Sequence, residues 1–119
     1  MELDRGGRLT IPGGGQLVSP EGWSADHLVL AALIRCSIES FAYHARRAGH
    51  TVTAAGSAHG VITRSGDDER FRFVEIDVTI DMQLEPRADD AAELIEKGER
   101  DCFVGASLSI KPRYEWRLS

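Results

Sequence analysis

The chain has 119 residues, 42% of them hydrophobic, so it is long enough for one domain with a modest core, and we treat residues 1–119 as a single domain. Its 14 basic and 19 acidic residues are interspersed, and the net charge of −5 leaves no basic stripe to follow a nucleic-acid backbone. The first residues lack the apolar segment of a signal peptide or a membrane span. We therefore expect a cytoplasmic protein that binds neither nucleic acid nor membranes.

Residues 6–22 are rich in glycine and predict turns, with short strands at about residues 8–11 and 16–19. The run Gly13-Gly14-Gly15 lacks the pattern of a phosphate-binding loop and does not lead directly into a helix. Turn formation is therefore its expected role.

A long helix is predicted over residues 26–48. Ser24 is the expected N-cap, and Gly49 is expected to end the helix. Residues 28–34 are nearly all apolar, so this half of the helix is expected to be buried on all sides. After Cys36 the pattern becomes amphipathic, which predicts one buried stripe.

The segment after the helix predicts a β-hairpin. Small and apolar residues alternate over residues 51–63, which predicts a strand with a thin inner face, and residues 64–69 predict the turn. The return strand alternates over residues 74–84, and a change of parity predicts a bulge near Val74.

The C-terminal third predicts a second helix and a final strand. Asp90 is the expected cap of the helix, and Cys102 lies at its C-terminal end. Alternation over residues 106–118, with Pro112 in the pattern, predicts a strand at a sheet edge. The order is β-β-α-β-β-α-β, and two helices cannot cover both faces of a sheet. We therefore expect an α+β fold in which sheet wraps the long helix.

Cys36 and Cys102 are the only cysteines. Two thiols in such positions are either a redox pair or two inert side chains, because free cysteine often packs as a small hydrophobe. In the cytoplasm a working pair would have to cycle between thiols and disulfide. No zinc site is expected, because none of the histidines has metal-ligand spacing: His27, His44, His50 and His59.

Two landmarks surround these cysteines. Residues 24–36, SADHLVLAALIRC, place a cysteine ten residues after an acidic residue, and residues 99–104, ERDCFV, place the second cysteine after the second helix. With the element order from about residue 5 onward, these segments make the chain resemble the OsmC/Ohr family of osmotically inducible and organic hydroperoxide resistance proteins. Asp26 stands where that family usually has glutamate.

The resemblance implies a thiol-dependent peroxidase for organic hydroperoxides that acts in oxidative-stress defence as an intertwined homodimer. It implies that Cys36 attacks the peroxide and becomes a sulfenic acid, with which Cys102 forms a disulfide. An external dithiol, lipoyl groups in the best-known branch, is the implied reductant. No bound cofactor or metal is expected.

A thiolate at Cys36 needs a cation, because an apolar surrounding raises the pKa of a thiol and a mid-helix position gains nothing from the helix dipole. The resemblance places the activating arginine at Arg5, in an Arg-x-Gly turn; Arg8 is the second candidate and Arg35 the third. A solvated terminal residue is the alternative interpretation of Arg5.

The resemblance gives Asp26 the role of orienting that arginine. Ten residues of helix span about 15 Å, so Asp26 reaches Cys36 only if the helix breaks or if it comes from the other subunit. The alternative interpretation of Asp26 is a first-turn acid that the helix dipole favours.

A second hypothesis, from a different class, is a catalytically weak or inactive OsmC-like homodimer that binds a small apolar ligand at the subunit interface. The strand expected before the Arg5 turn is reduced to about residues 1–4, which favours this hypothesis. Aromatic side chains near the thiol would suit an apolar ligand under either hypothesis.

Overall fold

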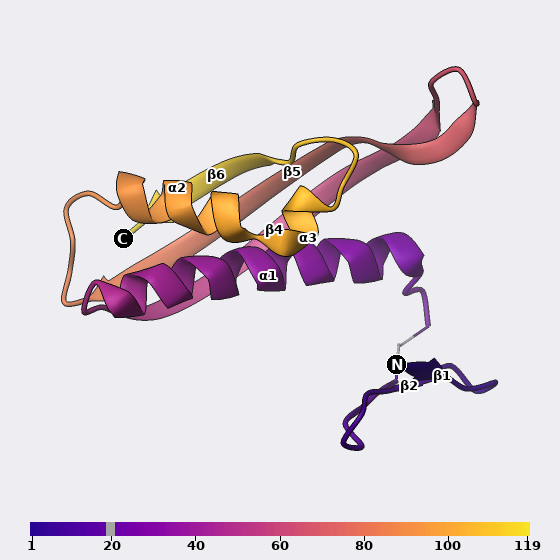
Figure 1. The fold of residues 1–119 in the computed structure, drawn as a ribbon, viewed down its shortest axis with the longest axis horizontal. Helices are drawn as coiled ribbons and strands as arrows, with labels where there is room; N and C mark the ends of the chain where they lie inside the picture. Colours follow the sequence, from indigo (N-terminus) through magenta and orange to yellow (C-terminus); the bar gives the residue numbers. More distant parts are fainter. Residues whose placement is uncertain (19–20) are drawn as a thin grey trace.

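The structure is a computed structural model that describes residues 1–18 and 21–119 (Figure 1). The elements are, in order, β1 (Glu2–Leu3), β2 (Arg8–Thr10), β3 (Gln16–Val18), α1 (Ala25–Arg47), β4 (Thr51–Ser65), β5 (Arg70–Glu85), α2 (Ala92–Asp101), α3 (Phe103–Ala106) and β6 (Arg113–Leu118). The α+β class is confirmed, and all seven expected elements are present. The structure adds β1 and α3, and residue 19 of the second expected strand lies outside the described residues.

Helix α1 begins and ends at the expected signals. Ser24 is the N-cap, and its backbone N–H donates to Nδ1 of His27 at 3.1 Å, which closes a capping box. Gly49 follows the C-cap with a φ of 91°, a conformation that favours glycine and cannot continue the helix.

Strands β4 and β5 form a long antiparallel hairpin around the predicted turn (Figure 1). Gly66 lies in this turn with a φ of 81° and accepts a hydrogen bond from the backbone of Glu69 at 3.2 Å. Val61 pairs with Glu75 whereas Ile62 pairs with Phe73, so Val74 is the extra residue and the predicted bulge is confirmed.

The main sheet has the order β4-β5-β6, and β6 lies at its edge, parallel to β5. The predicted alternation along β5 is confirmed, since every second side chain from residue 76 is at most 2% exposed: Ile76, Val78, Ile80, Met82 and Leu84. These side chains face α1 and α2, so the core lies between the sheet and the helices.

The inner face of β4 is thin where α1 crosses it. A Cβ atom on Gly56 would lie 3.0 Å from Cγ2 of Ile34, and one on Gly60 would lie 3.4 Å from Cδ2 of Leu30. The missing side chains therefore allow α1 to approach the strand closely, which confirms the thin face that the sequence predicted.

The segment before β6 corrects the expected final strand. Residues 103–106 form the helical turn α3, and β6 begins only at Arg113. The backbone N–H of Ala106 donates to the carbonyl of Cys102 at 3.0 Å, and that of Gly105 donates to the Cys102 sulfur at 3.4 Å. Because local acceptors satisfy these donors, sheet pairing is not needed here.

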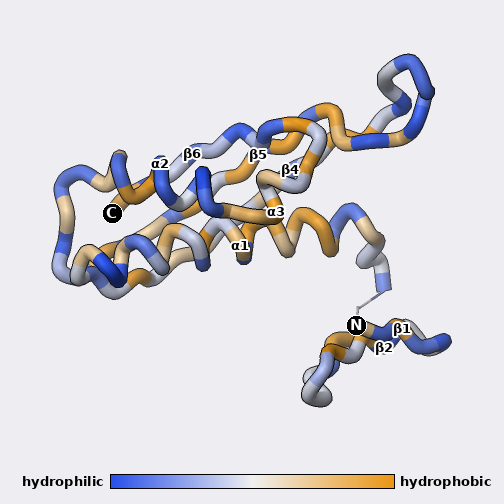
Figure 2. Tube along the Cα trace, in the orientation of Figure 1, coloured by the Kyte–Doolittle hydropathy of each residue, from blue (hydrophilic) through white to orange (hydrophobic). Residues whose placement is uncertain are grey.

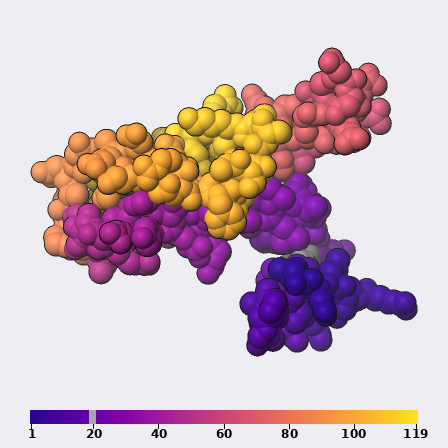
Figure 3. Space-filling view, in the orientation of Figure 1, coloured from indigo at the N-terminus to yellow at the C-terminus, as the bar shows by residue number. Residues whose placement is uncertain are grey.

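Residues 1–18 form a separate three-stranded sheet in the order β1-β2-β3. Figure 3 shows this sheet as a lobe that stands apart from the rest of the molecule, and its main contacts are within itself. Several of its apolar side chains are more than half exposed: Leu3, Ile11, Leu17 and Val18. A single chain thus leaves this sheet without an apolar surface to pack against.

The N-terminal half of α1 corrects the expectation of complete burial. Of residues 28–34 only Leu33 is fully buried, Ala32 is exposed, and the others are partly exposed. Figure 2 shows hydrophobic colour along this half of the helix, which the sheet and the other helices cover on one side only. The helix has the length and hydropathy of a membrane span, a property that core helices share, and its buried face packs on the sheet.

Helix α2 packs on α1 at a glycine. A Cβ atom on Gly98 would lie 3.1 Å from Cα and 3.3 Å from N of Phe41, which are backbone atoms that cannot rotate away. The start of α2 lies one residue later than expected, because Asp90 accepts the N–H of Ala92 at 2.9 Å and Ala91 is the N-cap.

Gly98→Ala is expected to destabilise the protein by about 1–3 kcal/mol, because overpacking between two backbones outweighs the gain in helix propensity. Urea unfolding followed by circular dichroism measures this change, with Glu96→Ala on the exposed side of α2 as the control. Equal or higher stability of Gly98→Ala would show that the helices separate easily here.

Candidate active site

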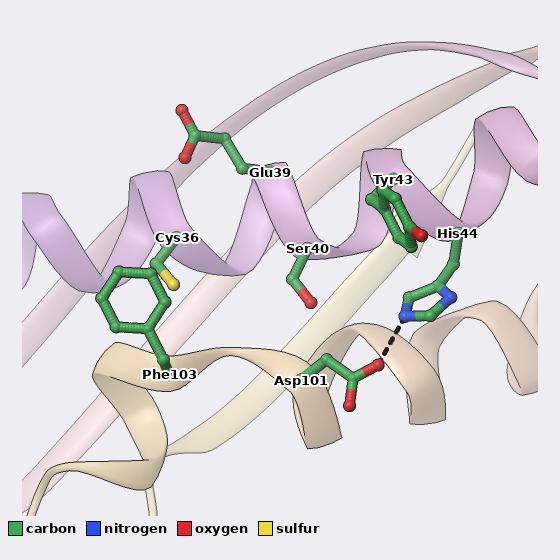
Figure 4. Close-up of a pocket in the computed structure, with 7 residues that line it drawn as sticks. All are labelled: Cys36, Glu39, Ser40, Tyr43, His44, Asp101 and Phe103. Carbon is green, nitrogen blue, oxygen red and sulfur yellow. Dashed lines mark hydrogen bonds and ion pairs between the residues drawn. The ribbon is translucent and has the colours of Figure 1, made fainter.

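Cys36 lies in the middle of α1 and faces the end of α2 and the start of α3. Its side chain is 7% exposed and borders a cavity of about 280 Å³ (Figure 4). The other lining residues are Glu39, Ser40, Tyr43, His44, Asp101 and Phe103. The cavity therefore has a thiol at one end and an ionisable pair at the other.

Cys102 lies at the junction of α2 and α3 and is completely buried. Both cysteines are free thiols in one hydrophobic cluster with Leu33. The two cysteines that are 66 positions apart in the sequence thus meet in the core, and only Cys36 borders the cavity.

The surroundings of Cys36 favour its neutral form. Burial raises the pKa of this thiol, backbone hydrogen bonds from Val104 and Phe103 oppose that effect in part, and the neighbouring Cys102 raises the pKa further. A group in this position needs an additional positive charge to become a thiolate near neutral pH.

The sulfur of Cys102 has polar neighbours in an otherwise apolar core. The backbone N–H of Gly105 donates to it at 3.4 Å, and the buried hydroxyl of Ser37 lies 3.5 Å away. The Ser37 oxygen is also 3.0 Å from the Tyr114 hydroxyl. No sequence motif pointed to Ser37 or Tyr114, because Tyr114 reaches the site only through the parallel pairing of β6 with β5.

The far end of the cavity holds a hydrogen-bonded pair of ionisable side chains. His44 and Asp101 are joined at 2.7 Å between Nε2 and Oδ2, and Arg100 donates to the same carboxylate at 2.8 and 2.9 Å. Cys36, Ser40 and His44 are four residues apart, so they share one helix face; this spacing was the signal that could have indicated the site.

Ser40 lies between Cys36 and His44 in the cavity wall (Figure 4). Its hydroxyl is buried and has no hydrogen-bond partner among the residues that the structure describes. A buried hydroxyl without a partner is costly, so it is available to bind a polar atom of a ligand in the cavity.

Asp26 lies at the start of α1, where its carboxylate accepts a hydrogen bond from the Ser24 hydroxyl. That hydrogen bond is the main cause of the lowered pKa of Asp26. Because α1 is unbroken from residue 25 to residue 47, about 15 Å of helix separate Asp26 from Cys36 within one chain. The structure does not bring these two residues together.

Arg5 lies in the turn between β1 and β2, where the Asp4 carboxylate accepts the backbone N–H groups of Gly6 and Arg8, each at 2.9 Å. Its side chain is exposed, and it belongs to the sheet that stands apart. Arg35 pairs with Glu39 at 3.1 Å on the exposed side of α1. No arginine or lysine among residues 1–18 and 21–119 lines the Cys36 cavity.

Possible metal ligands are also scattered. Within the part of the chain that the structure describes, no group of three or more His, Cys, Asp or Glu side chains is placed to hold a metal ion. The pair of His44 with Asp101 is already joined to Arg100.

Comparisons with known proteins agree with this architecture. The family model described as OsmC-like protein matches residues 15–117. An OsmC-like protein of unknown function from Vibrio cholerae superposes with a TM-score of 0.76 at 15% identity, over 94% of this chain and 84% of that one. An OsmC-like protein from Mycoplasma pneumoniae gives 0.74 at 18% identity, over 98% and 92%.

The organic hydroperoxide resistance protein OhrB of Bacillus subtilis gives a TM-score of 0.58 at 17% identity, over 99% of this chain and 93% of that one. At these identities the likeness establishes the fold. No curated protein sequence matches the chain significantly.

The Asp101 carboxylate is expected to make the stability of the protein depend on pH. Hydrogen bonds from Arg100 and then from His44 hold the pKa of Asp101 well below its ordinary value of 3.8. A carboxyl group whose pKa is lower in the folded chain than in the unfolded chain stabilises the protein at every pH above its ordinary pKa. That stability is lost as the pH falls through the lowered pKa. Asp101→Asn is therefore expected to lower the melting temperature at pH 7, and the difference should narrow below pH 4.

Thermal unfolding at pH 7, 5, 4 and 3 tests this expectation. Asp89→Asn, an exposed aspartate in the loop before α2, is the control and should show no such trend. A difference between wild type and Asp101→Asn that grows toward acid pH would contradict the assignment.

Proposed function

This chain belongs to the OsmC-like protein family, and from that premise we propose that it reduces organic hydroperoxides with Cys36 as the attacking thiol and Cys102 as the resolving thiol. This proposal rests on one observation: the only two cysteines of the chain belong to the same hydrophobic cluster. Of the two, Cys36 lines the cavity. Solved relatives named as organic hydroperoxide resistance proteins, from Bacillus subtilis and Legionella pneumophila, support the substrate class.

The proposed cycle begins at the cavity. The Cys36 thiolate attacks the distal oxygen of the hydroperoxide, the O–O bond breaks, and the electron pair leaves with the alkoxide, which takes up a proton to become the alcohol. The unpartnered Ser40 hydroxyl is the donor placed to meet the leaving oxygen. Cys36 is left as a sulfenic acid.

The second half of the cycle restores the thiols. The Cys102 thiolate attacks the sulfenic sulfur and the S–O bond breaks. Hydroxide leaves and takes up the proton that the Cys102 thiol lost, so water is released and the Cys36–Cys102 disulfide forms. An external dithiol, for which lipoyl groups are our first candidate, then reduces the disulfide. We place this cycle in the cytoplasm, where such dithiols keep protein disulfides reduced.

We further propose that Arg5 of a partner subunit supplies the missing positive charge. The raised pKa of Cys36 requires a cation, and the cavity of one chain has no arginine or lysine among its described lining residues. The sheet that carries Arg5 stands apart with exposed apolar side chains, and α1 leaves an apolar half uncovered. A homodimer that packs these surfaces together would also allow Asp26 of one subunit to orient Arg5.

A second candidate function is supported by the electrostatics of Cys36. If no cation reaches this thiol, burial keeps it neutral and slow, and the cavity would only hold a small apolar ligand beside Phe103 and Tyr43. In that case the protein is a binding homodimer of the same fold.

Cys36→Ser is expected to lower hydroperoxide consumption to the uncatalysed rate, because no sulfenic acid forms. Cys102→Ser should consume about one equivalent and stop, since nothing resolves the sulfenic acid. Stopped-flow measurements with cumene hydroperoxide show both effects, and intact mass should show the wild type about two hydrogens lighter after one equivalent. Wild type that reacts as slowly as free cysteine and keeps both thiols would support the binding function instead.

Arg5→Ala is expected to slow the oxidation of Cys36 by about tenfold or more and to move the midpoint of its thiolate titration upward, because burial is then unopposed. Arg8→Ala, on the same hairpin, is the matched control. Light scattering should give twice the 13.1 kDa mass of the chain for both variants.

Mixed dimers test whether Arg5 acts from the partner. Arg5→Ala keeps Cys36 and Cys36→Ser keeps Arg5, so a dimer of one of each has one complete site. Refolding the slow Arg5→Ala variant together with the inactive Cys36→Ser variant should raise the activity above that of either variant alone. Failure to raise it, or an Arg5→Ala variant as fast as wild type, would contradict the assignment.

A further inference from the structure

The two thiols differ in what surrounds them. Cys36 borders the cavity, whereas Cys102 is 0% exposed and is not among the residues that line this cavity. An external thiol can therefore reach the sulfur of Cys36 but not that of Cys102. If the two form a disulfide, Cys102 is the sulfur that must leave with the negative charge.

A negative charge on a completely buried sulfur is unfavourable unless donors surround it. One donor is in place at Cys102, the backbone N–H of Gly105 at 3.4 Å, and the Ser37 hydroxyl lies 3.5 Å from the sulfur, within reach to donate to a thiolate. Ser37 is itself completely buried, and its oxygen lies 3.0 Å from the Tyr114 hydroxyl.

The hydrogens in this group can be counted. Ser37 has one hydroxyl hydrogen, which it donates to the carbonyl of Leu33 at 2.8 Å, so its oxygen accepts from Tyr114 and from the Cys102 thiol. When Cys102 loses its proton, the Ser37 hydroxyl can rotate toward the sulfur. The Leu33 carbonyl keeps the helical N–H of Ser37, and Tyr114 continues to donate to the Ser37 oxygen.

We propose that Ser37 and Tyr114 are positioning residues that stabilise the Cys102 thiolate, so that Cys102 is the leaving group when an external dithiol attacks Cys36. This inference rests on the proposed disulfide cycle. In this scheme the external dithiol attacks Cys36 from the cavity, and the negative charge that results lies on the buried sulfur of Cys102.

The step balances as a thiol–disulfide exchange. One thiolate of the external dithiol attacks Cys36, the Cys36–Cys102 bond breaks, and the electron pair goes to Cys102. The second thiol of the reductant then attacks the mixed disulfide, so Cys36 leaves as a thiolate and the reductant closes into its own disulfide. Two electrons pass from the dithiol to the protein, and its two protons end on the two cysteines.

The surroundings of Tyr114 support this role. Burial is the main cause that raises the pKa of Tyr114 to about 12, with the Cys102 thiol and Glu99 adding to it and Ser37 opposing it. Tyr114 therefore keeps its proton and remains a donor at neutral pH. Cys36 on α1 also neighbours Cys102. Asp101, the residue before Cys102, pairs with Arg100 at 2.8 Å.

To test this role, the Cys36–Cys102 disulfide is formed with diamide, so that no hydroperoxide is needed. Diamide oxidises wild type, Ser37→Ala and Tyr114→Phe, with Ser57→Ala, an exposed hydroxyl on β4, as the control. Reduction by dithiothreitol is then followed by quenched-flow mass spectrometry. Ser37→Ala is expected to be reduced about fivefold more slowly than wild type, Tyr114→Phe by a smaller factor, and Ser57→Ala at the wild-type rate.

A second readout needs no disulfide. In a Cys36→Ser background Cys102 is the only cysteine, so the ultraviolet absorbance of its thiolate can be titrated without interference from a second thiol. Adding Ser37→Ala should move the titration midpoint of Cys102 upward by about one pH unit, a change that a purely structural role would not produce.

The outcomes separate this inference from the proposed function. Unchanged reduction rates with an unchanged midpoint, or no disulfide after diamide, would overturn the role of Ser37 and Tyr114. If wild type fails to react with hydroperoxide but the diamide-made disulfide and the titration show the expected effects, the peroxidase proposal fails and this inference stands.

Discussion

The close packing of α1 against the sheet and α2 is the constraint on which the rest of the structure depends. Gly56 and Gly60 on β4 and Gly98 on α2 leave no side chain where α1 passes, so Leu30, Ile34 and the backbone at Phe41 come close to their neighbours. This approach holds Cys36 against the junction of α2 and α3. A looser helix would separate the two thiols, and the candidate site would not exist.

The same packing creates an electrostatic problem. A thiol placed in the middle of a buried helix face is desolvated, and its pKa rises when a reactive thiol needs the opposite. Backbone N–H groups at the start of α3 lower the pKa of Cys36, but they offset only part of the effect of burial. In the function that we propose, the remaining charge comes from outside the cavity, and both the N-terminal sheet and one side of α1 expose apolar side chains in the single chain. Reactivity and assembly are therefore linked in the function that we propose.

The two sides of the thiol pair have different chemistry. The Cys36 side opens on a cavity with an unpartnered Ser40 hydroxyl and the His44–Asp101 pair, which suits a ligand with a polar head. The Cys102 side is closed and holds hydroxyl groups in an apolar cluster, where a polar group is retained only if it is hydrogen-bonded. In the cycle that we propose, substrates enter on the Cys36 side and the negative charge of the leaving thiolate lies on the Cys102 side.

The sequence by itself determined the elements with strong local signals: the capped helix that Gly49 ends, the hairpin with its bulge at Val74, the α+β class and the two cysteine landmarks. It predicted a strand over residues 106–118 because alternation does not show that Cys102 accepts local N–H groups. It also predicted full burial of residues 28–34, since hydropathy does not tell which surface covers a helix. Only the tertiary structure joined Ser37 to Cys102 and to Tyr114, and His44 to Asp101. Each of these contacts joins residues 57 or more positions apart, a separation over which sequence periodicity carries no information.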